Sequence, residues 1–578
     1  MALTDNNNKE KIVNTTGNFG VDINLIKGLV WTSRLAGTIN NRRYESFNGP
    51  KTYDGIDYDG HSITANSFLN YNVDIQKLNI AATLGYEYNE NYSKSYVMDI
   101  GGFPDIPGLE GPANGSEYLW ADWNISGNTR WTERSESYFF RANLSYNRKY
   151  LLGFSIRRDG TSKLAKENRY SNFPAVSAGW VISDEAFMSR QHVINLLKLR
   201  TSYGMTGSIT NVSMADCYDR LSSDIYWGKP ALSVATLGNP DLQWEKTNQV
   251  DVGVDLALFQ NRLTLIAEWY LKRTSGMMNS EPLPSSTGGY TSRKINAGTI
   301  RNSGVDLALN FQHHFTKDWG LTAGINMNIN RSKVIDLPVD NWAYSSAYYG
   351  GGNTPRPRLK IGQSFGALEM YRALGLDERG DIIYDDVSGN GSIDAADKVI
   401  IDNLTPKFTG GLNLGVSWKN LSLFGQFSFT YGGKIYNLDE QLLRSTELGY
   451  DDVMKNKPDY ILDRWTQENQ SSRYPRFVVG AHGAQNETGW NDRPSTLYLF
   501  DASFLKLNKL TLSYNLPQNW IQKLGMTSCS VYLSGENLFT LKNKKLNVPD
   551  PEAALTSGIA QKGVPSPRSF MIGLDLTF

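Results

Sequence analysis

The sequence predicts an all-β fold and, within that class, a transmembrane antiparallel β-barrel. Apolar and polar residues alternate with period two in about seventeen segments of roughly ten residues each. The connections between these segments are alternately short and long. No window approaches the roughly 18 consecutive apolar residues that a membrane-spanning helix needs. A strand with one apolar and one polar face must separate an apolar phase from water, as the wall of such a barrel does.

Composition narrows the class of protein further. The 578 residues include 58 Lys plus Arg and 58 Asp plus Glu, so the formal net charge is zero. This balance excludes a chain-wide basic surface for nucleic acid and an acidic tail. Two cysteines, Cys217 and Cys529, exclude a disulfide scaffold and a multi-cysteine zinc site. The residues after Met1 lack the charged and apolar regions of a secretion signal.

The C-terminal segment shows the alternation most clearly. One face consists of Phe570, Ile572, Leu574, Leu576 and Phe578, and the residues between them are polar or small. Asn and Gly are frequent on the polar face of other segments, which predicts a hydrated, spacious interior because both are poor strand formers. The predicted strands lie near 19–26, 29–46, 62–75, 78–96, 136–147, 150–159, 173–183, 196–206, 244–258, 263–274, 299–312, 320–333, 408–418, 421–432, 502–515, 527–538 and 569–578.

Connection lengths indicate how these strands are joined. Short periplasmic turns and long extracellular loops are typical of bacterial outer-membrane barrels. Trp31, Trp180, Trp319 and Trp418 near strand ends fit aromatic girdles at the membrane surfaces. A soluble β-sandwich or propeller is the alternative, but no fixed repeat of about 40–50 residues is present and the second face is too polar for a dry core. The predicted long external loops cover 97–135, 207–243, 275–298, 334–407, 433–501 and 539–568.

A series of short motifs follows in fixed order from about residue 135 to the C-terminus. The motifs are RDGTSK at 158–163, FPAVSAGW at 173–180, ISDEAF at 182–187, LRTSYG at 199–204, GNPDLQWEK at 238–246, NAG at 296–298, NSGV at 302–305, DVSGNG at 386–391 and the terminal Phe578. Together they resemble the SusC/RagA family of TonB-dependent outer-membrane transporters.

The resemblance implies a larger architecture than the predicted strands supply. Members of that family have a signal peptide, a plug domain inside the barrel and twenty-two strands. The seventeen predicted strands would leave five of these, and the plug, unaccounted for. We therefore expect residues 1–578 to form one partial barrel that corresponds to the C-terminal majority of a family member. A fragment, a split gene and a trimmed chain remain open as explanations.

One loop matches a calcium-binding pattern of EF-hand type. In the twelve residues 386–397, oxygen-bearing side chains stand at positions one, three, five and twelve, with Gly391 at position six. Calcium needs several hard oxygens that converge on one point, and alternate loop positions supply them. Because no helical pattern flanks the loop, we expect a structural ion in an external loop rather than a sensor. The predicted ligands are Asp386, Ser388, Asn390, the Ser392 carbonyl, Asp394 through water, and Asp397.

Two other patterns have simpler explanations. Gly362, Ser364 and Gly366 match the GxSxG nucleophile elbow, which needs a preceding buried strand, a following helix and a later acid and His. The preceding residues are basic and interrupted by proline, and only His482 follows, so a chance match is favoured.

Loop aromatics could stack on sugar rings or hold a peptide, or they could pack the loops together. These are Trp120, Trp123, Tyr218, Trp227, Trp342, Tyr344, Tyr348, Tyr349 and Trp490.

The resemblance implies a non-enzymatic protein of the outer membrane that imports an oligosaccharide or oligopeptide nutrient. Its implied partners are the TonB complex, acting through the plug, a SusD-like surface lipoprotein that covers the mouth, membrane lipid, and the barrel-assembly machinery. The apolar face of 570–578 would be the assembly signal. Three alternatives remain open: a passive porin-like channel, a secreted calcium-dependent glycan-binding β protein, and a hydrolase that uses Ser364.

Overall fold

The computed structural model describes most of the chain. The described residues are 7–47, 52–101, 117–118, 129–213, 216–287, 290, 292–339, 342–343, 354–402, 404–444, 457–472, 474–476, 490–522, 525–554, 558–561 and 565–578. Strands dominate throughout, and the helices are short. No helix in these residues has the length and apolar character needed to cross a membrane.

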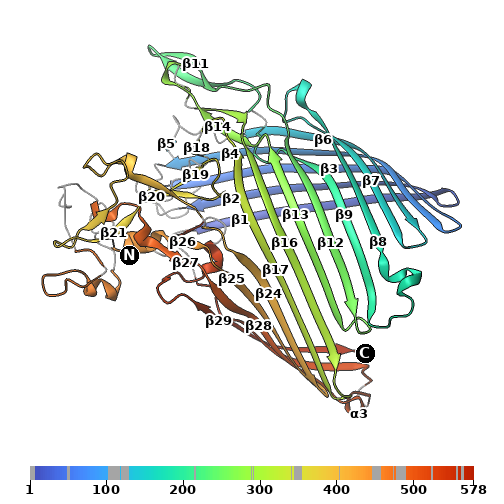
Figure 1. The fold of residues 1–578 in the computed structure, drawn as a ribbon. Helices are drawn as coiled ribbons and strands as arrows, with labels where there is room; N and C mark the ends of the chain where they lie inside the picture. Colours follow the sequence, from blue (N-terminus) through green and yellow to red (C-terminus); the bar gives the residue numbers. More distant parts are fainter. Residues whose placement is uncertain are drawn as a thin grey trace. The chain divides into compact units, whose positions relative to one another are not determined.

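One antiparallel sheet of eighteen strands contains every strand that the sequence predicts (Figure 1). One of the eighteen, β5 (Glu117–Tyr118), has only two residues, so seventeen long strands remain. Consecutive long strands pair with each other. They are β1 (Asn7–Ile26), β2 (Leu29–Phe47), β3 (Thr52–Ile75), β4 (Leu78–Gly101), β6 (Thr129–Tyr146), β7 (Tyr150–Thr161), β8 (Tyr170–Val181), β9 (Ile194–Ser208), β12 (Glu245–Leu258), β13 (Leu263–Ser275), β16 (Thr299–His314), β17 (Trp319–Asp336), β24 (Phe408–Trp418), β25 (Leu421–Tyr431), β28 (Phe504–Asn515), β29 (Ser528–Lys542) and β31 (Ser569–Thr577).

The chain divides into two compact units. The first comprises Met1–Trp180, Ser202–Asn248 and Gly276–Ala297, and the second Val181–Thr201, Gln249–Ser275 and Gly298–Phe578. In the first unit, β1 to β4 and β6 to β8 pair in sequence order. In the second, β13, β16, β17, β24, β25, β28, β29 and β31 do the same. Strands β9 and β12 contribute residues to both units.

The sheet of the first unit has two chemically different faces. Leu84, Phe140 and Ile156 lie opposite one another on β4, β6 and β7, and all three are exposed. The adjacent row of Thr83, Arg141 and Ser155 points to the other face. Exposed leucine, isoleucine and phenylalanine in continuous rows indicate a face that lies against an apolar phase.

The second unit repeats this division. Its apolar face includes the row Leu309, Ile325, Leu412 and Phe427 across β16, β17, β24 and β25. One residue further along each strand, the polar face carries Asn310, Gly324, Asn413 and Gln426. The predicted alternation is therefore confirmed in both units.

All four predicted girdle tryptophans, Trp31 included, lie within three residues of the short-turn ends of their strands on the apolar face. Trp319 and Trp418 are cross-strand neighbours with ring centroids 5.9 Å apart. Trp180 lies opposite Tyr150, which stacks on Tyr146 across the next turn. Amphipathic rings at this level fit the boundary between hydrocarbon and water.

Several strands extend beyond the predicted bounds. β1 begins at Asn7 rather than near residue 19, and β3 begins at Thr52 rather than near 62. β4 and β6 run into the predicted loop 97–135, to Gly101 and from Thr129, and β29 runs to Lys542. The added residues of β1, β3 and β6 carry no continuous apolar face, so period-two hydropathy could not detect them, although their backbones stay hydrogen-bonded to neighbouring strands. Those of β29 include Phe539 and Leu541 on one face, and there the predicted end at residue 538 was too early.

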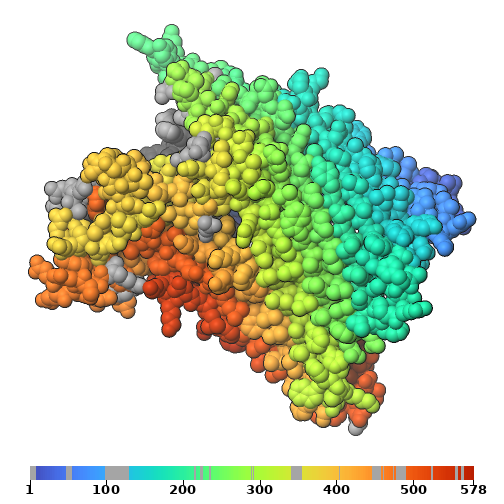
Figure 2. All heavy atoms as spheres, viewed as in Figure 1, coloured from blue at the N-terminus to red at the C-terminus, as the bar shows by residue number. Residues whose placement is uncertain are grey.

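The long segments of the second unit fold into a layer with its own core. Met370, Leu404, Tyr436 and Tyr498, from the predicted loops 334–407 and 433–501, pack with Ile559 from 539–568 in one buried cluster. A short parallel pairing of β26 (Lys434–Asn437) with β30 (Ile559–Ala560) joins the second and third segments. In Figure 2 the yellow, orange and red spheres of these segments lie against one another. We call these three packed segments the loop layer.

Gly304 provides a test of the packing on the polar face. A Cβ atom there would lie 2.3 Å from the Ile329 carbonyl oxygen and 2.4 Å from the Tyr270 hydroxyl. We expect Gly304→Ala to destabilise the folded protein by about 1–3 kcal/mol, because the backbone of the neighbouring strand cannot yield. Thermal unfolding in detergent measures the effect. Gly17→Ala on β1, where nothing lies within 4 Å, is the control and should leave the transition unchanged.

Candidate functional site

The polar face of the second unit carries a hydrogen-bonding wall. A cavity of about 330 Å³ is lined by side chains of β13, β16, β17 and β24, among them Glu268, Asp306, Asn326 and Asn328. Asn328 Nδ2 donates to Asp306 Oδ1 and, at 3.3 Å, to the hydroxyl of Tyr270. Amide and carboxylate groups of this kind can bind hydroxyl-rich or amide-rich solutes without selecting a single charge.

Tyr270 organises this wall. Its ring crosses Gly304, and its hydroxyl donates to Asn330 Oδ1 at 3.1 Å. The alternation in the sequence predicts a polar face rich in Asn, but it does not identify Tyr270 or Asp306 as part of this wall. The available signal was their position in the polar register of β13 and β16, which requires the strand pairing to be known.

Charges on the polar face occur as neutralised groups. In the second unit, Arg200 bonds to Asp255 at 3.2 Å and to Glu268 at 2.5 Å, joining β9, β12 and β13. In the first unit, Arg157 contacts Asp159 and Glu87 at 2.5 and 3.2 Å. Paired charges keep the wall polar without a strong net field that would reject neutral solutes.

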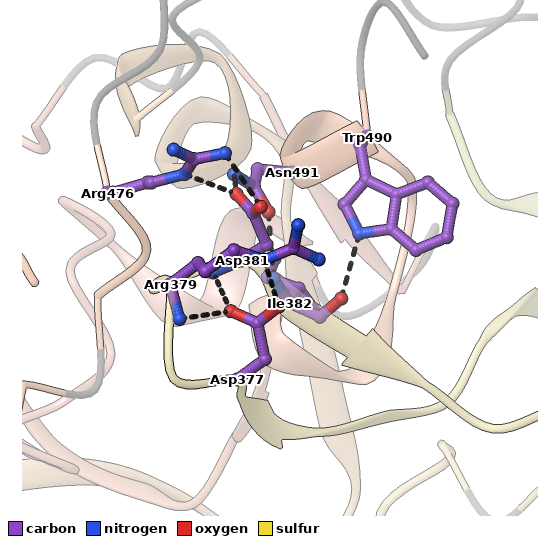
Figure 3. A network of polar contacts seen from close by, with 7 residues as sticks. All are labelled: Asp377, Arg379, Asp381, Ile382, Arg476, Trp490 and Asn491. Carbon is purple, nitrogen blue, oxygen red and sulfur yellow. Dashed lines mark hydrogen bonds and ion pairs between the residues drawn. The ribbon is translucent and has the colours of Figure 1, made fainter. Parts of the chain in front are cut away.

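A network of buried polar contacts holds the loop layer together (Figure 3). The carboxylate of Asp381, which is fully buried, accepts two hydrogen bonds from Arg476 at 2.7 and 2.8 Å and one from Asn491 at 3.0 Å. These hydrogen bonds raise the pKa of the Arg476 guanidinium. They tie the hairpin of β21 (Ala373–Leu376) and β22 (Ile382–Tyr384) to residues about a hundred positions later in the chain.

Trp490 belongs to the same network and is buried. Its indole nitrogen donates to the Ile382 carbonyl at 2.8 Å, and its own carbonyl accepts from the Tyr384 hydroxyl at 2.8 Å. Burial raises the pKa of Tyr384 well above its usual value. Of the two alternatives for Trp490, the contacts favour packing of the loops against each other.

Other predicted loop aromatics have different environments. Trp227 lies at the turn between β10 (Arg220–Tyr226) and β11 (Lys229–Thr236) and is 88% exposed, and Tyr218 is also exposed. Trp342 lies in the two-residue strand β18 (Trp342–Ala343). Trp120, Trp123, Tyr344, Tyr348 and Tyr349 lie outside the described residues. Trp227 and Tyr218 therefore retain faces that a ligand or partner could contact.

The predicted calcium loop is compact, and two of its carboxylates bond to its backbone N–H groups. Asp386 accepts from the backbone N–H groups of Gly389 and Gly391 at 2.8 and 2.9 Å. Asp397 accepts from the N–H groups of Ser388 and Asp394, both at distances below 3.0 Å, and these bonds lower the pKa of its carboxyl. The carboxylate stays ionised well into acid, as a calcium ligand must be.

The remaining predicted ligands form hydrogen bonds with one another or with the backbone. Asn390 Nδ2 donates to Asp394 Oδ2 at 3.2 Å, while Asp394 caps the short helix at Ala395–Asp397 through the N–H of Ala396. The Ser388 hydroxyl lies 3.3 Å from Asp386. No group of three His, Cys, Asp or Glu residues gathers around one point anywhere in the described part of the chain. Calcium at Asp386, Ser388, Asn390, Ser392, Asp394 and Asp397 stays a prediction.

Ser364 lies in a turn between two short antiparallel strands, β19 (Arg356–Leu359) and β20 (Leu368–Tyr371). Gly362 and Gly366 adopt positive φ angles of 90° and 97°, and the serine hydroxyl donates to Asp402. A strand follows where a nucleophile elbow requires a helix, and His482 lies outside the described residues. The local structure agrees with a chance match to GxSxG.

The predicted assembly segment forms the last strand. Phe570, Ile572 and Leu574 project from β31 on the apolar side, opposite Gly535, Leu533 and Val531 of β29, and Leu576 follows in the same register. All of them, with the terminal Phe578, are exposed. Their role in assembly stays a prediction.

A large antiparallel sheet with one apolar and one hydrogen-bonding face, short turns at one end and folded segments at the other, defines the wall of an outer-membrane β-barrel. The family model described as "TonB dependent receptor-like, beta-barrel" matches residues 2–538, and the chain belongs to this family. The resemblance to SusC/RagA proteins is confirmed, and the location is the outer membrane. Because this is a receptor family, the hydrolase alternative is wrong.

Individual relatives and a solved structure support this family assignment. TonB-dependent receptor P3 of Formosa agariphila is 27% identical over 551 residues, which cover 89% of this chain and 52% of the relative. TonB-dependent receptor SusC of Bacteroides thetaiotaomicron is 29% identical over 462 residues, covering 76% of this chain and 43% of the relative. The RagAB peptide transporter structure matches with a TM-score of 0.84 and 26% identity over 99% of this chain and 62% of that one. The chain spans about half the length of these curated relatives.

The buried carboxylate of Asp381 generates a prediction about the loop layer. Asp381→Asn should weaken the docking of the segment around Arg476 by about 2–3 kcal/mol, because it leaves the guanidinium without its counter-charge. Hydrogen exchange or limited proteolysis of the loop layer measures this effect. Arg379→Gln, which alters an exposed ion pair in the same hairpin, is the matched control. Equal protection in both variants would contradict the assigned role of Asp381.

Calcium binding at 386–397 is tested by titrating CaCl2 into the purified protein in a calorimeter. We expect heat with a dissociation constant of about 0.1–1 mM, the range of external calcium modules, and none from MgCl2. Asp397→Asn should abolish it, whereas Asp385→Asn, beside the loop and paired with Arg372, should not. Since the pKa of Asp397 is lowered, binding should persist from pH 7 to 5 and fail only in stronger acid. Absence of heat at pH 7 would refute the prediction.

Proposed function

We propose that this protein forms the wall of an active importer that carries an oligosaccharide or oligopeptide nutrient across the outer membrane. The observation that carries the proposal is the polar face around Tyr270, Asp306 and Asn328, where hydrogen-bonding groups line a cavity behind an apolar outer face. Such a wall can pass a large polar solute by exchanging hydrogen bonds along its length. The relation to the RagAB peptide transporter supports a peptide or a solute of similar size.

We propose two partners for this importer. A SusD-like surface lipoprotein would cover the mouth, and the loop layer, stiffened by Asp381 and its own hydrophobic core, offers it a structured platform. The TonB complex would supply energy through a plug, as the family description suggests. Membrane lipid and the barrel-assembly machinery complete the expected contacts. Calcium in the 386–397 loop would stiffen the same layer.

The polar wall is tested by uptake in cells that carry the complete protein. Asn328→Ala removes contacts to Asp306 and Tyr270, and we expect uptake of the nutrient to fall about 3- to 10-fold, the effect of one lost hydrogen-bonding group. Ile325→Leu, on the apolar face of the same strand and outside the lining of the cavity, should leave uptake unchanged at equal membrane levels. Equal uptake by both variants would contradict a role of this polar wall in transport.

Energy coupling and the lid are tested in the same cells. An uncoupler of the inner-membrane proton gradient should stop uptake, and mild detergent should co-purify a lipoprotein with the protein. Uptake that survives the uncoupler, with no lipoprotein attached, would instead support a passive porin-like channel.

A further inference from the structure

A row of cations crosses three strands of the second unit. Arg273 of β13 lies directly opposite Arg301 of β16, and Arg301 lies directly opposite Lys333 of β17. Arg331 stands one step closer to the apolar rows, opposite Ser303. Figure 1 draws these three strands side by side. We call Arg273, Arg301, Arg331 and Lys333 the cation row.

The cation row lies on the apolar face of the sheet. Pairing of β16 with β17 is uninterrupted from Ile300 to His314, so Arg301 shares its face with Val305 and Leu309. The polar face carries the alternate residues, such as Lys272, Asn302 and Ser332. Since the apolar face meets lipid in a membrane barrel, the cation row faces lipid and not the transport path.

Its level along the strands coincides with the membrane surface. The girdle residue Trp319 and Ile329, the last apolar residue of β17 before the cations, are ten positions apart. At about 3.3 Å per residue and a tilt of about 40°, ten positions span roughly 25 Å of membrane, the height of the apolar band of a barrel. Arg331 and Lys333 follow directly, at the long-connection end, where lipid headgroups begin.

No acidic side chain of the described residues neutralises the cations of this row. All four side chains are exposed, and among the described residues none of them forms an ion pair. Like charges directly opposite each other on a sheet are destabilising. By contrast, Arg134 of the first unit, also beyond the apolar rows, bonds to Glu90 at 2.7 Å. The uncompensated row indicates that an anion from outside the chain sits against it.

A cavity beside the row can hold such an anion. It has a volume of about 700 Å³, and its lining includes Arg301, Arg331, Lys333 and Lys407 together with Ser364 and Asp402. Asp402, the acidic residue of this lining, accepts hydrogen bonds from the Ser364 backbone and hydroxyl. Four cations therefore face one carboxylate that already has partners.

We propose that the cation row and this cavity bind the phosphate groups of lipid headgroups in the outer leaflet. Guanidinium groups match phosphate oxygens in a bidentate geometry, and basic clusters beside an apolar membrane surface attract anionic headgroups. Bound phosphates would relieve the repulsion between Arg273, Arg301 and Lys333. Phosphate binding at this site fixes the position of the wall along the membrane normal. This role does not depend on which solute the protein carries.

The test compares lipids in neutral detergent micelles. Phosphatidic acid, which carries a phosphomonoester, should raise the melting temperature of the purified protein, whereas phosphatidylcholine and inorganic phosphate should not. Each charge removed should weaken the apparent lipid affinity about fivefold, so Arg301→Gln shows a partial loss and Arg301→Gln/Lys333→Gln a nearly complete one. Without added lipid, these variants should melt at the same temperature as the parent or higher, since like-charge contacts are removed.

Lys272→Gln is the matched control, because it changes a cation next to Arg273 that points to the opposite face. It should keep the full response to phosphatidic acid. An equal loss in Lys272→Gln would show a general charge effect and overturn the proposal. An equal response of the parent protein to phosphatidylcholine, or to inorganic phosphate, would also overturn it, the latter by showing a site for free anions.

Discussion

Every long strand of this protein must satisfy two phases at once while its backbone groups pair with neighbouring strands. In a membrane, an unpaired N–H or C=O group finds no water, so the strands must pair continuously. Continuous pairing then fixes the alternation of side chains, with Leu309, Ile325 and Leu412 on one face and Asn310 and Asn413 on the other. The polar wall, the aromatic girdle and the cation row all follow from this alternation.

The requirement for apolar side chains on the outer face ends where the apolar rows end. Beyond Ile329 and Val305 the strands leave the hydrocarbon, and charged residues become tolerable on the outer face. Charged residues on the outer face at this level occur in two different environments. Arg134 and Glu90 neutralise each other, whereas Arg273, Arg301 and Lys333 have no ion pair within the described part of the chain. The environment of the cation row favours an anion supplied by the membrane.

Outside the sheet, the long segments of the second unit are stabilised as a small soluble domain would be. Tyr436 and Tyr498 are fully buried, and the ion pair between Asp381 and Arg476 links segments 95 residues apart. A layer held this way keeps its surface in a defined shape, which suits it to contact a partner. Its aromatic content therefore has a structural cause at Trp490, while Trp227 remains accessible at a hairpin tip.

The sequence by itself determined the all-β class, the seventeen long strands and the two faces, because period-two hydropathy records directly which side chains meet lipid. It left the first twelve residues of β1 unassigned, since Asn7 to Asn18 carry no continuous apolar face. Only the tertiary structure decided strand register, and a shift of one residue would reverse every face. Register brings Tyr270 across Gly304 and aligns Arg273 with Arg301 and Lys333. The pairing of Asp381 with Arg476 was likewise decided only by the tertiary structure, because contacts between distant loops leave no periodic signal in the sequence.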